Sequence, residues 1–214
     1  MSSPALFDAT ALWAVSPMLA LTAGVVLLLA ACALRLPRWA RTAVVLLSLG
    51  LALGLQYGLL VARTPPGLVL DGTLQADRGT AMWGLIFIAG AALAWLFSRD
   101  YYVEDRPFVD EHDALVLTTP VGMALMAGAQ DLIVFFVGLE LLSIPLYALA
   151  AFRRNRARSV EAGLKYFLLG AFAAAFFLYG AALIYAGTGS VSLVELHTIG
   201  IETPLALAGV ALLA

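Results

Sequence analysis

Residues 131–152 read DLIVFFVGLELLSIPLYALAAF, and this stretch decides the class of fold. After Asp131 it holds a single charged side chain, Glu140. A helix that crosses the hydrocarbon core of a bilayer needs about 20 mostly apolar residues, and this stretch has that length. It therefore predicts a membrane-spanning helix with one carboxylate near its middle.

The composition of the whole chain agrees with that prediction. Of the 214 residues, 63% are hydrophobic and 12% are charged, and the mean hydropathy is +0.97. Soluble domains carry about 25% charged residues, so these values exclude an ordinary soluble enzyme domain, a disordered chain and a nucleic-acid-binding domain. A single cysteine, Cys32, excludes a disulfide within the chain and a metal cluster of thiolates.

Apolar runs follow one another along the chain, separated by short connections. They cover residues 11–34, 40–62, 79–98, 114–129, 131–152, 161–186 and 204–214. The last run has only 11 residues, too few to cross a bilayer at 1.5 Å of rise per residue. We therefore expect an all-α, polytopic transmembrane helical bundle with six full spans and the start of a seventh, as a fragment of a longer protein.

Arginine counts in the connections predict the orientation. The connections on one side hold nine of the eleven arginines, namely Arg35, Arg38, Arg41, Arg99, Arg106, Arg153, Arg154, Arg156 and Arg158. Those on the other side hold Arg63 and Arg78. Because cytoplasmic loops are enriched in Lys and Arg, the first set predicts the cytoplasmic side, and the N-terminus is expected outside.

Glu140 is the only acid deep inside a predicted span, and it is our first candidate site residue. A carboxylate in lipid is costly unless it is paired, hydrated or protonated, so a proton-transfer role is favoured. The alternative is an interhelical hydrogen bond made by a protonated carboxyl group. Pro145 follows five residues later and leaves the Leu141 carbonyl without its helical donor, which could admit water or could simply bend the helix.

Lys165, the only lysine, begins the sixth run and is the second candidate. With Ser159 as the helix cap, Lys165 lies about 9 Å into the helix, whereas Glu140 lies about 18 Å from the same side. This difference favours two proton stations bridged by water over a direct salt bridge. The alternative is a lysine that extends back to the membrane surface.

Tyr147 and Tyr166 are supporting candidates that could donate to a polar chain between the stations, although core or interfacial packing is an open alternative. His112 and His197 are predicted to be solvated loop residues, and Asp131 is predicted to cap a helix. No metal-binding or cofactor-binding pattern is present in the sequence.

Residues 138–190 carry a family resemblance. They read GLELLSIPLYALAAFRRNRARSVEAGLKYFLLGAFAAAFFLYGAALIYAGTGS. This stretch closely resembles the subunit N family of bacterial proton-pumping NADH-quinone oxidoreductase, complex I, which is related to Mrp-type antiporter subunits. The resemblance implies an antiporter-like fold with inverted repeats, each with a broken helix. It also implies that Glu140 and Lys165 match the family's glutamate and lysine of the fifth and sixth helices.

By this resemblance we expect a translocase subunit in the bacterial inner membrane, with other membrane subunits of complex I as partners. Residues 1–110 would form an N-terminal three-helix region, and residues 111–214 would form the first part of the proton-translocation repeat. The chain would hold no redox centre, because NADH, FMN, iron-sulfur clusters and quinone would bind to other subunits. An Mrp-type antiporter subunit, a membrane-bound hydrogenase subunit and a structural membrane scaffold are the alternatives.

The predicted topology is testable by labelling. Cysteines introduced at Ser3 and at Asn155 should react with membrane-impermeant reagents from opposite faces of sealed vesicles, because an odd number of spans separates them. Labelling of both positions from one face would contradict the span count.

Overall fold

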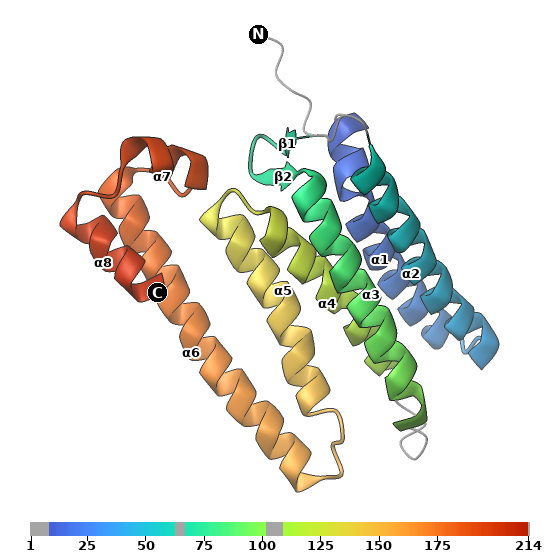
Figure 1. The fold of residues 1–214 in the computed structure, drawn as a ribbon. Coiled ribbons are helices and arrows are strands. Elements are labelled where there is room, and N and C mark those ends of the chain that lie inside the picture. The colour runs from blue at the N-terminus through green and yellow to red at the C-terminus, as the bar shows by residue number, and fades with distance from the viewer. Residues whose placement is uncertain (1–8, 63–66, 102–108, 214) are drawn as a thin grey trace.

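The computed structural model describes residues 9–62, 67–101 and 109–213, and within these ranges it is a bundle of long helices. Figure 1 shows the helices running up and down in succession, so that alternate turns lie at the same end. The helices are α1 (Ala9–Ala33), α2 (Arg38–Val61), α3 (Arg78–Tyr101), α4 (Val109–Gly128), α5 (Leu132–Ala150), α6 (Ala157–Thr188), α7 (Leu193–Ile199) and α8 (Pro204–Leu213). A helix forms over each predicted apolar run, which confirms the all-helical membrane fold class.

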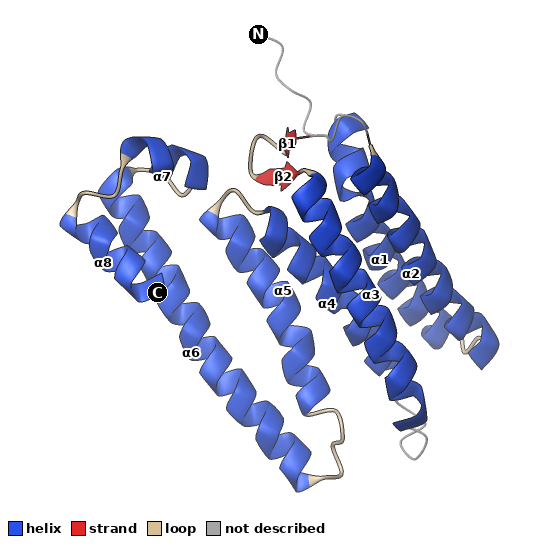
Figure 2. Ribbon diagram, viewed as in Figure 1, coloured by secondary structure: helices blue, strands red, loops and turns tan. Residues whose placement is uncertain are grey.

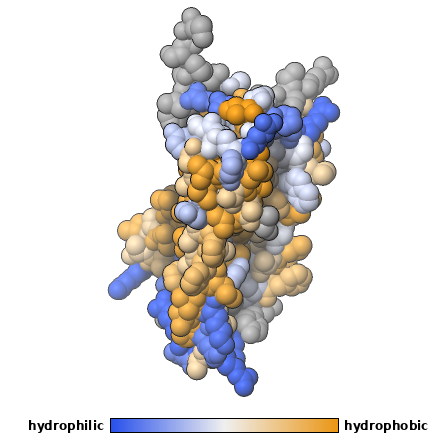
Figure 3. Space-filling model, turned by 90° about the vertical axis from the view of Figure 1, so that its left-hand side faces the viewer, coloured by the Kyte–Doolittle hydropathy of each residue, from blue (hydrophilic) through white to orange (hydrophobic). Residues whose placement is uncertain are grey.

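Five helices within the described ranges are long and apolar enough to cross a membrane: α1, α2, α3, α5 and α6. The turns between α1 and α2 and between α5 and α6 share the lower end in Figure 1, as the arginine pattern predicts. Arg63 and Arg106 lie outside the described residues. Figure 3 shows hydrophilic residues gathered at the two ends and a wide apolar band between them.

The helix over the fourth predicted span, α4, is not among these five helices. It forms the centre of the bundle. It packs against α1, α3 and α5, and its side chains Leu117 and Val121 are buried. Its first turns carry Asp110, Glu111 and Asp113, which lower its mean hydropathy. A helix enclosed by its neighbours exposes little surface to lipid, so it does not need a continuous apolar exterior.

A short hairpin interrupts the expected connection between α2 and α3. Strands β1 (Gly67–Val69) and β2 (Leu74–Ala76) pair antiparallel, with Val69 opposite Leu74. Figure 2 places them at the upper end of the bundle. The turn uses positive φ angles at Leu70, Asp71 and Gly72, and Val69 and Leu74 are buried. Strands of three residues are too short to show alternation, so the sequence predicts only a connection here.

Asp77 connects the hairpin to the start of α3. Its Oδ1 accepts from the Thr80 backbone N–H at 2.7 Å, and the Thr80 hydroxyl accepts from the Asp77 backbone N–H at 2.9 Å. This reciprocal arrangement satisfies donors at the helix start. The Thr80 N–H holds the pKa of the Asp77 carboxyl below its usual value, so the capping carboxylate stays charged at neutral pH.

A close helix crossing joins α4 and α5 through two glycines. A Cβ added at Gly122 would lie 2.5 Å from the Leu142 nitrogen and 2.7 Å from the Gly138 carbonyl oxygen. A Cβ at Gly138 would lie 2.9 Å from the Met126 nitrogen and 3.0 Å from the Gly122 oxygen. The two backbones are therefore in direct contact, which small residues permit in membrane helix pairs.

Replacing Gly122 with alanine should destabilise the protein. The new methyl group meets backbone atoms that cannot rotate away, so we expect a loss of about 1–3 kcal/mol in the free energy of unfolding. The measurement is unfolding of the full-length protein in mixed detergent micelles.

Gly50→Ala is the matched control, because nothing lies within 4 Å of the Cβ it would add on α2. That variant gains helix propensity without a clash, so it should unfold at the same denaturant concentration as the wild type or at a higher one. Equal behaviour of the two variants would contradict the close crossing.

Candidate functional site

The site begins with the placement of α5, whose start is well defined. Asp131 is the residue before the helix, and its Oδ1 accepts from the backbone N–H groups of Ile133 and Val134 at 2.7 and 3.3 Å. The predicted cap is confirmed. The Leu132 N–H also donates to the Val191 carbonyl at 3.0 Å, which fixes this end of α5 to the segment after α6.

Glu140 lies eight residues into α5, about 12 Å from its first residue. Its side chain is half-buried, and no hydrogen bond or ion pair to it is recorded among the described residues. Val137 and Ile144, one turn to either side, are 51% and 57% exposed. Glu140 therefore lies at the border between the packed part of α5 and a face that the described chain leaves open.

The packed part of α5 beside Glu140 faces α6. Phe136, one turn before Glu140, stacks on Phe177 with ring centroids 5.8 Å apart. Tyr147, two turns after it, lies against Gly170, where an added Cβ would come within 3.0 Å of the Tyr147 ring. Because residues four and seven apart share a helix face, Glu140 lies at a level between these two contacts.

Between those contacts, α6 presents small residues to α5. Ala173 and Ala174 share the face of Gly170 and Phe177, whereas Phe172 and Phe176 are 68% and 52% exposed. The antiparallel course of the two helices brings this alanine segment to the level of Glu140. Methyl side chains leave room beside a long acidic side chain, and this room could hold water or a side chain from elsewhere.

Pro145 is buried inside α5, and the helix continues through it to Ala150. Its ring nitrogen has no hydrogen, so the Leu141 carbonyl lacks its usual helical donor. That carbonyl lies one residue after Glu140. The structure thus combines a carboxylate and a released backbone acceptor within one turn of helix.

Tyr147 and Tyr166 are brought together. Their rings meet edge to face with centroids 4.8 Å apart, and Tyr147 makes a second such contact with Phe167 at 5.9 Å. Tyr166 is 43% exposed. The pair forms an aromatic contact between α5 and α6, nearer the arginine-rich end than Glu140.

Lys165 is not brought to Glu140. Its Nζ donates to Glu161 Oε1 at 2.5 Å, and the two side chains are 70% and 61% exposed. Lys165 shares the face of α6 that carries Leu169 and Phe172, which are 72% and 68% exposed. Within the described chain, this face points away from α5. Lys165 therefore lies on the side of α6 that is turned away from Glu140.

Two expectations about polar residues at this end are wrong. Ser159 does not cap α6, which begins at Ala157; its hydroxyl instead donates to the Ala150 carbonyl at 2.8 Å. His112 is not a solvated loop residue, because it lies in α4, is 5% exposed and meets Phe152 edge to face at 5.4 Å. The central position of α4 buries even its polar first turns.

His197 is exposed, as expected, but it lies in the last turn of the short helix α7 and not in a loop. The seven residues of α7 are too few to show helical periodicity, so the sequence predicts no helix there. The Ser192 hydroxyl caps it by accepting from the Glu195 N–H at 3.5 Å.

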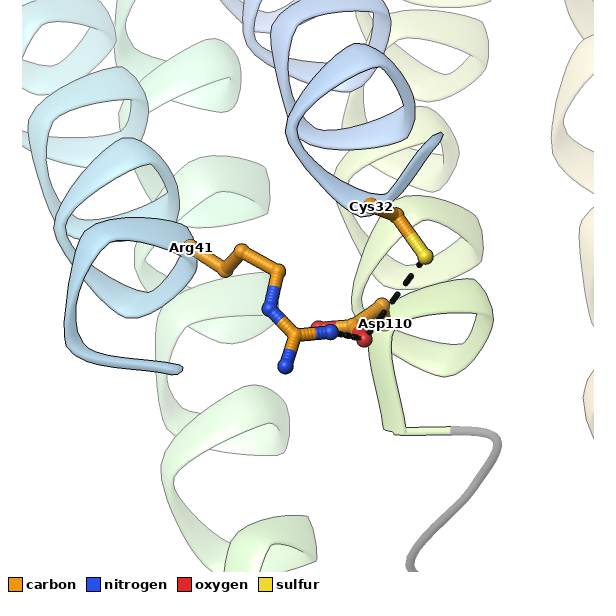
Figure 4. Close-up of polar contacts among 3 residues, drawn as sticks. All are labelled: Cys32, Arg41 and Asp110. Atoms are coloured by element: carbon orange, nitrogen blue, oxygen red, sulfur yellow. Dashed lines mark hydrogen bonds and ion pairs between the residues drawn. The ribbon is translucent and has the colours of Figure 1, made fainter. Parts of the chain in front are cut away.

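Sequence reasoning also missed an ion pair between α2 and α4. Figure 4 shows the Arg41 guanidinium reaching the Asp110 carboxylate, with the Cys32 thiol 3.9 Å from the same carboxylate. The Arg41 and Asp110 side chains are 19% and 17% exposed. Burial raises the pKa of Asp110, which precedes the apolar run 114–129, and Arg41 opposes that shift. One sequence holds no signal that joins positions so far apart.

Gln56 is a further buried polar side chain, and the sequence contains a pattern that points to it. Its Nε2 donates to the Ala81 carbonyl at 3.1 Å, and Gly84 leaves the space that it occupies. Gln56 is the only long polar side chain within the apolar run 40–62, apart from Arg41 at its start. Among the described residues, no group of three His, Cys, Asp or Glu side chains is arranged to hold a metal ion.

Comparisons with known proteins place this arrangement in a family. The family model described as NADH:quinone oxidoreductase/Mrp antiporter, TM, matches residues 129–214, which include α5, α6 and Glu140. Over 179 residues the chain is 38% identical to NADH-quinone oxidoreductase subunit N of Gemmatimonas aurantiaca, covering 81% of this chain. The chain therefore resembles members of the NADH:quinone oxidoreductase/Mrp antiporter family over most of its length. The predicted resemblance to subunit N is confirmed.

Other members of this family add to the comparison. Subunit N of Trichlorobacter lovleyi is 46% identical over 123 residues, or 58% of this chain. The chain spans 25% of that protein and 34% of the Gemmatimonas protein, so it corresponds to about a quarter to a third of its relatives' length.

Solved structures agree with the helix arrangement. A chain of respiratory complex I from Thermus thermophilus matches with a TM-score of 0.70 and 34% identity, over 92% of this chain and 42% of that one. A chain of an archaeal membrane-bound sulfane sulfur reductase has the same fold, with a TM-score of 0.75 at 22% identity over 95% of this chain and 43% of that one.

Proposed function

We propose that this chain is part of a proton-translocating membrane subunit of NADH-quinone oxidoreductase, with Glu140 as a proton station. The observation that carries the proposal is the placement of Glu140. It is half-buried in the middle of a spanning helix, level with small residues of α6, with no recorded partner among the described residues. A structural hydrogen bond among the described residues would require a recorded partner.

In this proposal each side chain has a separate task. The Glu140 carboxylate takes up a proton from water, becomes neutral and returns the proton toward the other side of the membrane. The released Leu141 carbonyl beside Pro145 and the small residues of α6 give water a place to reach it. Tyr147 and Tyr166 close the α5–α6 contact toward the arginine-rich end, which keeps that water path narrow.

Lys165 is proposed as a second station, and its geometry modifies its role. Because it faces away from α5, it cannot exchange a proton directly with Glu140 within this chain. Its pairing with Glu161 across one helical turn places a charge pair near the arginine-rich end of α6. In the assembled complex, a charge that arrives on a neighbouring helix would attract or repel this pair. The change in local charge would then shift the proton affinity of the groups along the path.

The partners and the location follow from the same proposal. Other membrane subunits of the complex would lie beside this one in the bacterial inner membrane, with the arginine-rich end in the cytoplasm and the N-terminus outside. NADH, FMN, iron-sulfur clusters and quinone would bind to other subunits, and this subunit would carry protons without a redox centre. Residues 1–110 and 111–214 remain our proposed division into a three-helix region and the start of the translocation repeat.

The alternatives differ in what drives the path. An Mrp-type antiporter or a membrane-bound hydrogenase subunit could use the same two residues, and the description of the matching family model includes the Mrp antiporter. The subunit N relatives at 38–47% identity favour the oxidoreductase. A purely structural scaffold would need neither residue for proton transfer.

Glu140→Gln should lower proton pumping by the whole complex about tenfold or more, because the amide keeps the shape of the side chain but cannot exchange a proton as an acid. Glu140→Asp, which keeps the acid on a shorter stem, should have a milder effect. Pumping is measured in vesicles as the pH change driven by NADH oxidation, and assembly is measured by native electrophoresis.

Glu202→Gln is the matched control for that variant, because Glu202 is an exposed acid in the segment before α8. It should leave pumping unchanged. Wild-type pumping by an assembled Glu140→Gln complex would leave the scaffold or hydrogen-bond interpretation standing.

Lys165→Ala should reduce pumping severalfold, whereas Lys165→Arg should keep most of it because the charge is kept. Arg158→Gln removes an exposed cation two turns earlier in α6 and should have little effect. The comparison uses initial pumping rates at matched NADH oxidation. Equal rates for all three variants would remove Lys165 from the path.

A further inference from the structure

The turn between α1 and α2 has an unusual surface for a connection of four residues. We call Leu34, Arg35, Leu36, Arg38 and Trp39 the arginine–tryptophan turn. The two helices that it joins are both long and apolar enough to span a membrane, with 25 and 24 residues. The turn therefore lies where the hydrocarbon core meets the headgroup region.

Two of the three arginines around this turn have no side-chain partner among the described residues. Residues 34–42 hold three arginines and no acid. Arg41 points inward to Asp110, whereas Arg35 and Arg38 are exposed and make no recorded ion pair or hydrogen bond from their side chains among the described residues. The same segment therefore contains one arginine with an internal partner and two that face outward.

The apolar side chains of the turn are exposed to an extreme degree. Trp39 is 76% exposed and Leu34 is 73% exposed, while Leu36 is 41% exposed. Tryptophan is enriched at the membrane–water interface, because its ring is apolar and its N–H is a hydrogen-bond donor. Two outward arginines beside such a ring match a membrane surface, which has anionic headgroups on its outside and apolar acyl chains beneath them.

We propose that the arginine–tryptophan turn binds the headgroup of an anionic phospholipid. Arg35 and Arg38 donate hydrogen bonds from their guanidinium groups to the phosphate oxygens, a geometry for which this group is well suited. Trp39 and Leu34 lie at the boundary between the headgroup and the acyl chains. Charge complementarity selects an anionic lipid, and the exposed ring and leucine select a membrane surface over a soluble acidic partner.

The turn between α5 and α6 at the same end provides an internal contrast. Arg156 and Arg158 are exposed there as well, but the neighbouring residues are Asn155, Ala157 and Ser159. The one aromatic residue of that turn, Phe152, packs against His112. This second turn has the charge without an exposed aromatic ring, so it separates general attraction to the membrane from a specific headgroup surface.

The test uses the complete protein in its native membrane complex, transferred to lipid nanodiscs. The probes are a photoactivatable phosphatidylglycerol and a phosphatidylcholine with the same acyl chains. Mass spectrometry then measures the label on the peptide that contains residues 34–39. We expect about a fivefold or greater excess of phosphatidylglycerol label, since each arginine near a membrane surface favours anionic lipid by roughly that factor.

The variants separate the contributions of charge and ring. Arg35→Gln combined with Arg38→Gln should remove the phosphatidylglycerol excess and leave phosphatidylcholine labelling unchanged. Arg156→Gln combined with Arg158→Gln should leave the excess at residues 34–39 intact. Trp39→Ala should lower the label from both lipids, and higher salt should reduce only the excess.

Three results would overturn the proposal. The first is equal labelling of residues 34–39 by the two lipids in the wild-type complex. The second is an excess that survives the Arg35 and Arg38 substitutions. The third is no label from either lipid, which would show that a neighbouring protein covers the turn.

Discussion

The direct backbone contact between Gly122 and Gly138 is the constraint on which the rest of the bundle depends. It fixes the distance and the rotation of α5 against the central helix α4. Glu140, two residues after Gly138, therefore lies on the opposite face of α5. With one side of α5 occupied by α4, only the other side remains for α6. The position of the Glu140 carboxylate is therefore set by two residues that have no side chains of their own.

The positions of the helices could be predicted from the sequence because a bilayer imposes one strong rule. Each spanning segment must satisfy its backbone hydrogen bonds internally and present apolar side chains to lipid, so apolar runs mark helices directly. Asp131 was predictable as a cap because an acid before such a run has one common task. Glu140 was predictable as a candidate because a lone carboxylate inside a run is costly wherever its helix packs.

The remaining features depend on contacts between distant segments, and no local pattern carries them. His112 is predicted from the sequence to be a solvated loop residue because its contact with Phe152 joins distant positions in the chain. The contacts of Asp110 with Arg41 and Cys32 are likewise absent from any local pattern. The sequence predicts that Lys165 and Glu140 share one proton path because depth along a helix can be counted from the residue number. The helix face that Lys165 occupies cannot be counted in this way, because it depends on how α6 is rotated against α5. The hairpin of β1 and β2 was missed because three-residue strands are shorter than the period needed to detect them.

The backbone bonds at the upper end of the bundle have a mechanical consequence. The Gln130 N–H donates to Thr73, and the Leu132 N–H and Gln130 carbonyl bond to Val191 and Leu193, so main-chain bonds join three connections there. At the opposite end, the recorded links between α5 and its neighbours are made by side chains such as Ser159 and His112. Beyond Gly138, where α4 holds it, the rest of α5 up to Ala150 is a lever: a tilt of about 5° over these roughly 18 Å moves the far end by about 1.6 Å. The width of any aqueous gap between α5 and α6 would then change most at the arginine-rich end and least beside Asp131.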